Sequence, residues 1–265
     1  MTYENKKRVV VFDLDETLGY FTEIGIFWDS LNKYISIDQD NQEKHFFEII
    51  DLFKIYLRPY IINILRFIKR MKQKDKCYKV MIYTNNQGAE SWTKMISHYF
   101  ENKIKFKLFD QLILAFKVNG KRVEIGRTSH GKSITDLFRC ADIPQDCEIC
   151  FLDDKFHPDM EDECVYYIKM KPYHYSKDFN QMIEQYYGKF HNQMKLGEED
   201  DFKSFMIDYM KSFGNYKYKK SDEEHEIDGI VSKQVINCLK DFFKEKSIRQ
   251  TRRKRKRKDG TRKMN

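Results

Sequence analysis

The sequence predicts an α/β protein with a doubly wound parallel β-sheet, a β-hairpin insertion and a C-terminal helical region. Short apolar runs rich in β-branched residues alternate with longer segments of helical periodicity, as in sheets built from β–α–β units. Acidic residues directly follow several of these runs, and only helical patterns continue beyond Pro172. Because ligands of doubly wound sheets bind at the carboxyl ends of the strands, we expect the functional site at these acidic residues.

The first half of the expected sheet contains two strands and two helices. Residues 8–13 (RVVVFD) form an apolar run that ends in an acid, which predicts a buried parallel strand. Residues 58–72 open with Arg-Pro and place apolar side chains at helical spacing, so a helix is predicted with Pro59 at its first position. Residues 78–83 (YKVMIY) predict the second strand, and residues 88–100 the next helix.

The second half begins with a strand at residues 109–116 (FDQLILAF), followed by Asn119-Gly120, which predicts a hairpin turn that continues to Ile125. The remaining predicted elements are a short helix at 132–140, strands at 148–152 (EICFL) and 164–170 (CVYYIKM), and helices at 177–190, 201–213 and 227–246. The last helix carries its apolar residues along one stripe, so it is expected to pack on the sheet domain or on a partner.

Three parts are expected along the chain: a sheet domain at residues 8–175, a helical accessory region at 176–246 and a basic tail at 247–265. The tail has ten basic residues and one acid, a net charge of +9, so the rest of the chain carries −1 of the total of +8. Dense like charge predicts disorder. We expect the tail to contact nucleic acid or an import receptor and the protein to be nuclear; localisation with and without the tail tests this.

The chain has no long apolar stretch and no apolar N-terminal segment. Its longest apolar runs fall far below the roughly 20 residues that a membrane span needs. We therefore expect a soluble, intracellular protein without a membrane partner, whose six cysteines stay reduced. Cys147 and Cys150 have the spacing of a zinc pair, but a strand would turn them to opposite faces, so no metal is expected there.

Two carboxylates follow the first predicted strand in the segment DLDETL, at Asp13 and Asp15. Such a pair is suited to phosphomonoesters, whose enzymatic hydrolysis reaches accelerations of about 10²¹-fold, because a carboxylate nucleophile divides one difficult displacement into two easier ones. Asp13 would attack phosphorus. Asp15 would protonate the leaving oxygen and then activate the hydrolytic water. An isolated pair of this kind could equally be two solvated turn residues, so the interpretation depends on further groups.

Groups that could hold a phosphoryl group follow in the expected order. Thr84 stands after the second strand and offers a hydroxyl, and the backbone N–H groups of Asn85 and Asn86 could bind phosphoryl oxygens. Lys132 precedes a predicted helix and could neutralise charge on the transferring group. Lys117 and Lys121 are alternatives for this lysine.

Asp153 and Asp154 follow a later strand and offer the hard oxygen ligands that Mg²⁺ prefers. Asp13 and the backbone carbonyl of Asp15 would complete the metal site. With all of these groups in order, the sequence predicts Mg²⁺-dependent phosphoryl transfer.

These residues resemble the four motifs of the haloacid dehalogenase (HAD) superfamily, whose sheet is a Rossmann-like parallel one. Within it the chain most resembles the NLI-interacting-factor-like, or FCP/SCP, phosphatases that act on the C-terminal domain of RNA polymerase II. The resemblance covers roughly residues 8–175 and rests on DLDETL, Leu57-Arg58-Pro59, Tyr83-Thr84, the predicted hairpin, Asp136-Leu137 and Leu152-Asp153-Asp154. It implies a protein phosphoserine/phosphothreonine phosphatase that forms an aspartyl phosphate.

Two departures from that family keep other functions open. The family's lysine usually stands directly before Asp-Leu, where this chain has Thr135. Residues 84–88 (TNNQG) resemble the TNQxG of polynucleotide 3′-phosphatases and histidinol-phosphate phosphatases, so a nucleic-acid 3′-phosphate is an alternative substrate. A catalytically silent binding protein that uses the helices at 177–246 is a third possibility.

Several further residues have two interpretations each. Residues 20–57 lie where this superfamily inserts flaps or small caps, and no large cap is expected, because no long helical insertion follows Thr84. Aromatic residues of this segment could line a substrate groove, although a core position is favoured: Phe27, Trp28, Tyr34, Phe46 and Phe47. His157, close behind the acidic pair, could contact the metal ligands, although an ordinary loop histidine is favoured. Arg58 and Arg127 either bind a phosphate or lie on the surface.

Overall fold

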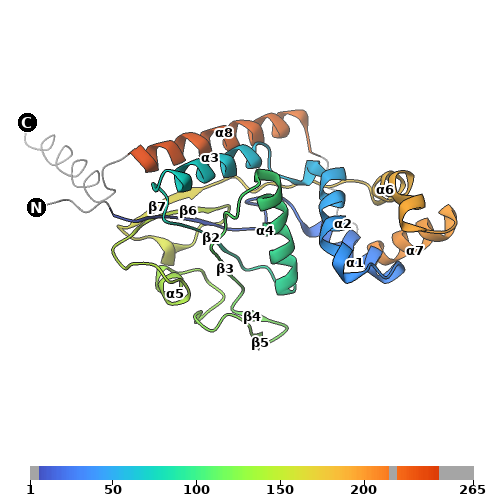
Figure 1. The fold of residues 1–265 in the computed structure, drawn as a ribbon, viewed down its shortest axis with the longest axis horizontal. Coiled ribbons are helices and arrows are strands. Elements are labelled where there is room, and N and C mark those ends of the chain that lie inside the picture. The colour runs from blue at the N-terminus through green and yellow to red at the C-terminus, as the bar shows by residue number, and fades with distance from the viewer. Residues whose placement is uncertain (1–5, 215–219, 245–265) are drawn as a thin grey trace, which may run out of the picture. The chain divides into compact units, whose positions relative to one another are not determined.

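The computed structural model describes residues 6–214 and 220–244 (Figure 1). Its centre is a five-stranded parallel sheet in the order β3-β2-β1-β6-β7. The strands are β1 (Arg8–Phe12), β2 (Lys79–Tyr83), β3 (Gln111–Ile113), β6 (Glu148–Asp153) and β7 (Val165–Lys169). The predicted mixed α/β class with a parallel sheet is confirmed, and this strand order is compatible with a Rossmann-like fold.

The strand order places the strand ends of interest next to each other. The chain runs from central β1 outward to β2 and β3, and then returns to the other side of β1 to form β6 and β7. Phe12 pairs with Ile82 of β2 on one side and with Leu152 of β6 on the other. The residue after Phe12 therefore lies beside the carboxyl end of β6, at the point where the strand order reverses, which is where such sheets bind ligands.

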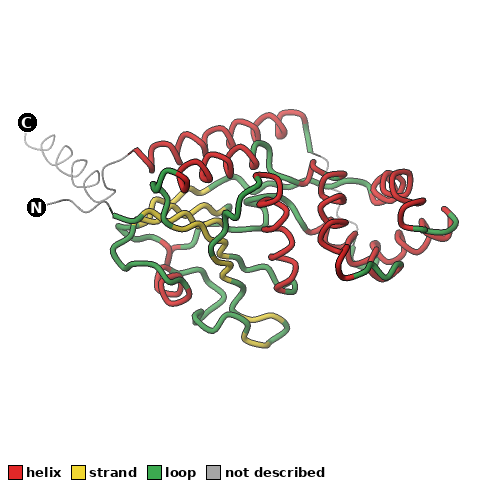
Figure 2. The backbone as a smooth tube through the Cα atoms, viewed as in Figure 1, coloured by secondary structure: helices red, strands yellow, loops and turns green. Residues whose placement is uncertain are grey.

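Helices cover both faces of this sheet (Figure 2). On one face α8 (Asp222–Lys244) runs alongside α3 (Ile61–Gln73), and the ring of Phe67 lies 6.1 Å from that of Phe243 (Figure 1). The opposite face packs against α5 (Ile134–Cys140) through an apolar cluster that includes Leu137. The helix α4 (Glu90–Ile104) connects β2 with β3 and packs against α3. Both faces of the parallel strands are buried, as their continuous apolar sequences require.

The predicted hairpin is present as β4 (Lys117–Val118) and β5 (Lys121–Arg122), which pair antiparallel. Asn119 and Gly120 between them both have positive φ angles, 50° and 76°. Two consecutive positive φ angles are the requirement of the tight turn that an Asn-Gly pair favours.

Three predicted boundaries are wrong for local reasons. The helix predicted at residues 58–72 begins at Ile61, because Tyr60 adopts a left-handed conformation (φ 59°) and separates Pro59 from the helix. The helix predicted at 132–140 begins at Ile134, since the Ser133 hydroxyl caps it by accepting a hydrogen bond from the Asp136 N–H. The strand predicted at 109–116 shortens to Gln111–Ile113.

A separate helical unit is formed by two distant parts of the chain, residues 19–58 and the described residues 173–214 and 220–227, while the described residues 6–18, 59–172 and 228–244 form the sheet unit. Its helices are α1 (Thr22–Tyr34), α2 (Gln39–Leu52), the short η1 (Lys54–Tyr56), α6 (Phe179–Met194) and α7 (Glu199–Lys211). The division differs from the expected boundaries at 175 and 176, because residues 19–58 pack with the later helices and α8 mostly packs with the sheet.

Aromatic side chains join the two parts of the helical unit. The ring of Phe27 on α1 lies 5.3 Å from that of Tyr186 on α6, and the ring of Tyr34 lies 5.1 Å from that of Phe202 on α7. Phe27, Trp28 and Phe46 are buried in this core, so a role in lining a substrate groove is wrong for these three.

A buried carboxylate adds a polar connection inside the helical unit. Glu23, in the first turn of α1, accepts hydrogen bonds from the hydroxyls of Tyr56 and Ser176 and from the backbone N–H of Lys177, the last at 3.0 Å. Burial raises the pKa of Glu23, and these three hydrogen bonds oppose the increase. One side chain thus connects the first part of this unit to the segment that leads into α6.

The predicted tail at 247–265 lies outside the described residues, and so do the last two residues of the helix predicted at 227–246. Within the part of the chain that the structure does describe, no helix is both long enough and apolar enough to cross a membrane.

Replacing Glu23 with Ala should destabilise the helical unit by about 3 kcal/mol, because three buried donors would lose their acceptor. Trp28 lies in the helical unit and Trp92 on α4 of the sheet unit, so fluorescence-detected urea unfolding in a Trp92→Phe background would follow the helical unit alone. Asp200→Ala, at an exposed position of α7, is the matched control.

The cost of Glu23→Ala should also depend on pH. The raised pKa means that the folded unit binds this proton more tightly than the unfolded chain does, so the contribution of Glu23 is largest at low pH and decreases as pH rises through its folded pKa. The stability gap between the two proteins should therefore widen on acidification. A gap that narrows would contradict this account.

Candidate active site

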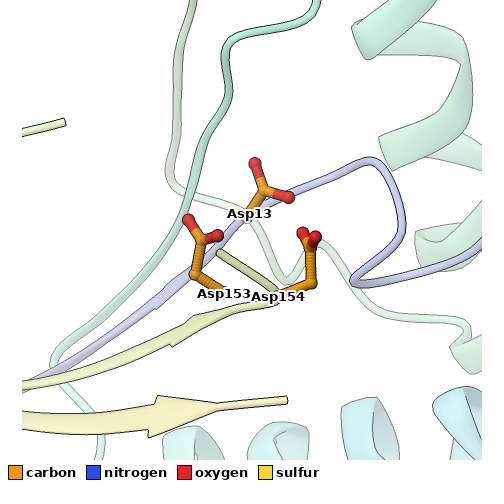
Figure 3. Close-up of side chains that lie close together, drawn as sticks. All are labelled: Asp13, Asp153 and Asp154. Carbon is orange, nitrogen blue, oxygen red and sulfur yellow. The ribbon is translucent and has the colours of Figure 1, made fainter. Parts of the chain in front are cut away.

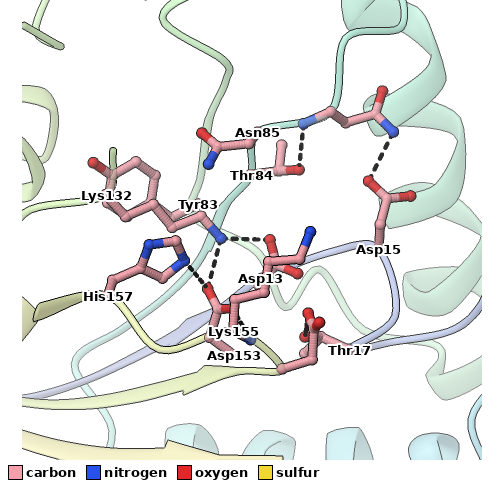
Figure 4. A network of polar contacts seen from close by, with 12 residues as sticks. Asp13, Asp15, Thr17, Tyr83, Thr84, Asn85, Lys132, Asp153, Lys155 and His157 are labelled. Atoms are coloured by element: carbon pink, nitrogen blue, oxygen red, sulfur yellow. Dashed lines mark hydrogen bonds and ion pairs between the residues drawn. The ribbon is translucent and has the colours of Figure 1, made fainter. Parts of the chain in front are cut away.

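Three charged side chains meet at the carboxyl ends of β1 and β6 (Figure 4). Asp13 directly follows β1, and its backbone N–H donates to the Leu152 carbonyl of β6 at 2.9 Å. The Lys132 Nζ lies 2.5 Å from Asp13 Oδ1 and 2.7 Å from Asp153 Oδ2. All three side chains are buried, Lys132 with 2% of its surface exposed. The predicted nucleophile, lysine and first metal ligand are thus brought together.

Of the three lysines considered for this position, Lys132 reaches the acidic groups. The Lys117 Nζ lies instead above the ring of Phe116, 5.1 Å from its centroid, and Lys121 is exposed on the hairpin. Lys132 stands directly before the Ser133 cap of α5, so the start of that helix fixes the direction in which the lysine points.

Asp13, Asp153 and Asp154 form a buried acidic cluster (Figure 3). One carboxylate oxygen from each residue lies within 4.8 Å of the others, a spacing that could hold a metal ion. Asp154 Oδ1 accepts a hydrogen bond from the Thr17 hydroxyl at 3.3 Å, whereas Asp154 Oδ2 is buried and has no hydrogen-bond partner among the described residues. An unsatisfied buried carboxylate oxygen is costly, and a cation at this position would satisfy it.

The pKa shifts in this cluster follow mainly from burial, which neighbouring charges and hydrogen bonds either strengthen or oppose. Burial raises the pKa of Asp154 to about 7, and the charges of Asp13 and Asp153 add to the increase. Burial also raises the pKa of Asp13, although Lys132 opposes it. For Asp153 burial acts in the same direction, but hydrogen bonds from His157 and Lys132 outweigh it, so the pKa is lowered. A divalent cation would offset both the burial and the mutual repulsion that raise the pKa values of Asp13 and Asp154.

Asp15 faces a different partner. Asn86 Nδ2 donates to Asp15 Oδ2 at 2.8 Å, and Asp15 is not part of the acidic cluster (Figure 4). Burial raises the pKa of Asp15 to about 6, against the lowering effect of the Asn86 hydrogen bond. A carboxyl group with this pKa can both give and accept a proton near neutral pH, as general acid–base catalysis requires.

The loop after β2 forms another wall of the site. The Thr84 N–H donates to the Ile113 carbonyl of β3 at 3.0 Å, and the Thr84 hydroxyl accepts from the Asn86 N–H at 3.0 Å. Together these groups enclose a cavity of about 130 Å³. Its lining consists of Asp13, Asp15, Glu16, Thr84, Asn85, Asn86, Lys132, Asp153, Asp154, Lys155 and His157. Every predicted site residue therefore lies on one cavity.

Two residues that the sequence left with two interpretations each contact the groups of the site. His157 lines the cavity, and its Nε2 lies 3.3 Å from Asp153 Oδ2, so it is not an ordinary loop histidine. Its position four residues after Asp153 was the only signal. Arg127 is completely buried and binds Asn85 Oδ1 at 2.7 Å, so the surface interpretation is wrong for it. Arg58 is also buried, in the helical unit, with its guanidinium 5.7 Å from the Tyr173 ring centroid.

No protein-family model matches this sequence, and no curated protein matches it either.

Replacing Asp154 with Asn should have opposite effects with and without a divalent cation. Without the cation the variant should melt at a higher temperature, because one of three crowded carboxylates is removed. With saturating cation the melting temperature of the variant should increase less than that of the wild type. The variant lacks one carboxylate ligand, so it binds the cation more weakly and is stabilised less by it. Thermal unfolding in separate Mg²⁺, Mn²⁺ and Ca²⁺ titrations measures both effects.

Asp159→Asn is the matched control, since Asp159 is exposed and does not line the cavity. An equal cation-induced increase in melting temperature in the wild type and in Asp154→Asn would contradict a metal site at this cluster.

Proposed function

We propose that the protein is a Mg²⁺-dependent phosphomonoester hydrolase that forms an aspartyl phosphate on Asp13. The proposal rests above all on one observation, the direct contact of Asp13 with Lys132 in a cavity that also contains Asp15. A lone carboxylate beside a lysine would be an ordinary ion pair. Here a second carboxylate with a near-neutral pKa and a cation-sized acidic cluster accompany it, which together are the groups that two-step phosphoryl transfer needs.

In the first step an Asp13 oxygen forms a bond to phosphorus while the bond to the leaving oxygen breaks, and Asp15 gives its proton to that oxygen. In the second step Asp15 takes a proton from water, the water oxygen bonds to phosphorus, and the bond to Asp13 breaks to release inorganic phosphate. Lys132 stabilises the charge that develops on the phosphoryl oxygens. Asp13, Asp153 and Asp154 would hold Mg²⁺, with the Asp15 carbonyl as a further ligand, and the ion would shield these carboxylates from the anionic substrate.

Phosphoserine or phosphothreonine in a protein is the substrate that we favour. The resemblance to the phosphatases of the RNA polymerase II C-terminal domain supports this choice. The alternative is a 3′-phosphate on nucleic acid, and one observation favours it: Thr84, Asn85 and Asn86 of the TNNQG segment line the cavity, and Asn86 binds Asp15 directly. The gathering of all the reactive groups in one cavity speaks against a catalytically silent protein.

Hydrolysis of a phosphoserine heptad peptide and of a 3′-phosphorylated oligonucleotide, each with Mg²⁺ and with EDTA, tests the function. We expect Mg²⁺-dependent release of phosphate, faster from the peptide, and background activity for Asp13→Asn, because an amide cannot act as this nucleophile. A faster reaction with the oligonucleotide would reverse the substrate assignment. Near-wild-type activity of Asp13→Asn would refute the covalent mechanism.

Replacing Lys132 with Ala should lower kcat by about 10²-fold or more, as for other lost partners of transition-state charge. Lys117→Ala is the matched control, because Lys117 precedes Lys132 in the same connection but lies over Phe116. Initial rates on an aryl phosphate measure both variants. A larger loss for Lys117→Ala than for Lys132→Ala would show that the wrong lysine has been assigned.

A further inference from the structure

Arg127 connects the two loops that carry the proposed phosphate-binding groups. Its guanidinium donates to the Thr84 carbonyl at 3.0 Å and to Asn85 Oδ1 at 2.7 Å, both in the loop after β2. It also donates to the carbonyls of His130 and Gly131, at 3.0 Å and 3.2 Å, directly before Lys132. A fifth bond, 2.9 Å long, goes to the Leu114 carbonyl after β3. Segments far apart in the sequence are thus held by one planar group.

The surroundings of Arg127 fix the guanidinium in place. The side chain is fully buried, and its guanidinium carbon lies 4.8 Å from the centroid of the Tyr83 ring. The next residue, Thr128, is anchored as well, since its N–H donates to Asp136 Oδ2 at 2.8 Å. The bases of the two loops therefore cannot move apart without breaking several buried hydrogen bonds at once.

The charge of Arg127 has no direct acidic partner. All five acceptors are neutral carbonyl or amide oxygens, and within residues 6–214 and 220–244 Arg127 forms no ion pair. A buried cation that is held only by dipoles is costly unless an anion shares its surroundings. Arg127 donates directly to the Thr84-Asn85 loop, where the proposed function puts an anionic phosphoryl group.

We propose that Arg127 is a positioning residue of the phosphate-binding site, which fixes the spacing between the Thr84-Asn85 loop and Lys132. This role rests on the proposed function. Lysine cannot replace arginine here, because a single ammonium group does not present the planar fork that reaches five acceptors. A misplacement of about 1 Å between reacting groups can lower a rate by about 10²-fold, so a small change in loop spacing is enough to impair turnover.

Arg127→Lys tests the proposal because it keeps the charge and removes the fork. We expect kcat/KM for an aryl phosphate to fall about 10²-fold and inorganic phosphate to become a weaker inhibitor. The increase in melting temperature caused by Mg²⁺ should stay at the wild-type value, since Arg127 contacts none of Asp13, Asp153 and Asp154. Guanidinium ion at low concentration should partly restore the activity of Arg127→Ala and leave that of Lys132→Ala unchanged.

Arg139→Lys is the matched control, because the Arg139 side chain is 55% exposed and pairs with Asp136, at 3.5 Å. Wild-type turnover and phosphate inhibition in Arg127→Lys would overturn the positioning role and leave the proposed function intact. An inactive wild-type protein would refute the function itself, and the positioning role with it. If neither Arg127 variant folds, Asn85→Ala removes one of the five acceptors, and wild-type phosphate inhibition in that variant would overturn the role.

Discussion

The contact of Lys132 with Asp13 and Asp153 is the interaction on which the site depends. Parallel pairing of β1 with β6 brings the residues that end or follow these strands side by side, and both are carboxylates. Two such groups at the end of a buried sheet repel each other, and the fold tolerates them because a lysine lies between them at 2.5 Å and 2.7 Å. Several features of the surrounding structure position this lysine: the Ser133 cap, the short helix α5 and the hydrogen bonds from Arg127 to the carbonyls directly before Lys132.

The parallel sheet could be predicted because each of its strands is a short apolar run that ends at a polar residue. The same logic identified Asp13, Thr84 and Asp153, since strand ends in such a sheet meet at one edge. Lys132 was harder to predict as a site residue, because its position depends on where the chain turns before α5. Arg127 was considered as a phosphate-binding or surface residue, and nothing in its local sequence indicated that it would connect two loops. Its role arises from five acceptors that the fold assembles from other segments, and no spacing along the chain encodes them.

The helical unit shows a different limit of sequence analysis. Residues 22–52 contain two helices whose apolar residues do recur at helical spacing, so their periodicity could have been recognised. The helices that they pack against could not be identified from the sequence, because α6 and α7 follow more than a hundred residues later. The contacts that join the two parts include Phe27 with Tyr186 and Glu23 with Ser176. Pairing of this kind depends on tertiary packing that the sequence pattern does not reveal.

The charge balance of the cavity explains why this arrangement should bind ligands. Its lining includes five acids, Asp13, Asp15, Glu16, Asp153 and Asp154, against two lysines, Lys132 and Lys155, and His157. An excess of buried negative charge attracts a cation, yet the substrate proposed here is itself an anion. The cation and the anionic substrate can bind together only if positive charge lies between the substrate and the carboxylates. Under the proposed function, the cation would lie among Asp13, Asp153 and Asp154, and Lys132 would face the phosphoryl oxygens. The cation would offset part of the negative charge of the lining and so allow an anionic phosphoryl group to approach Asp13.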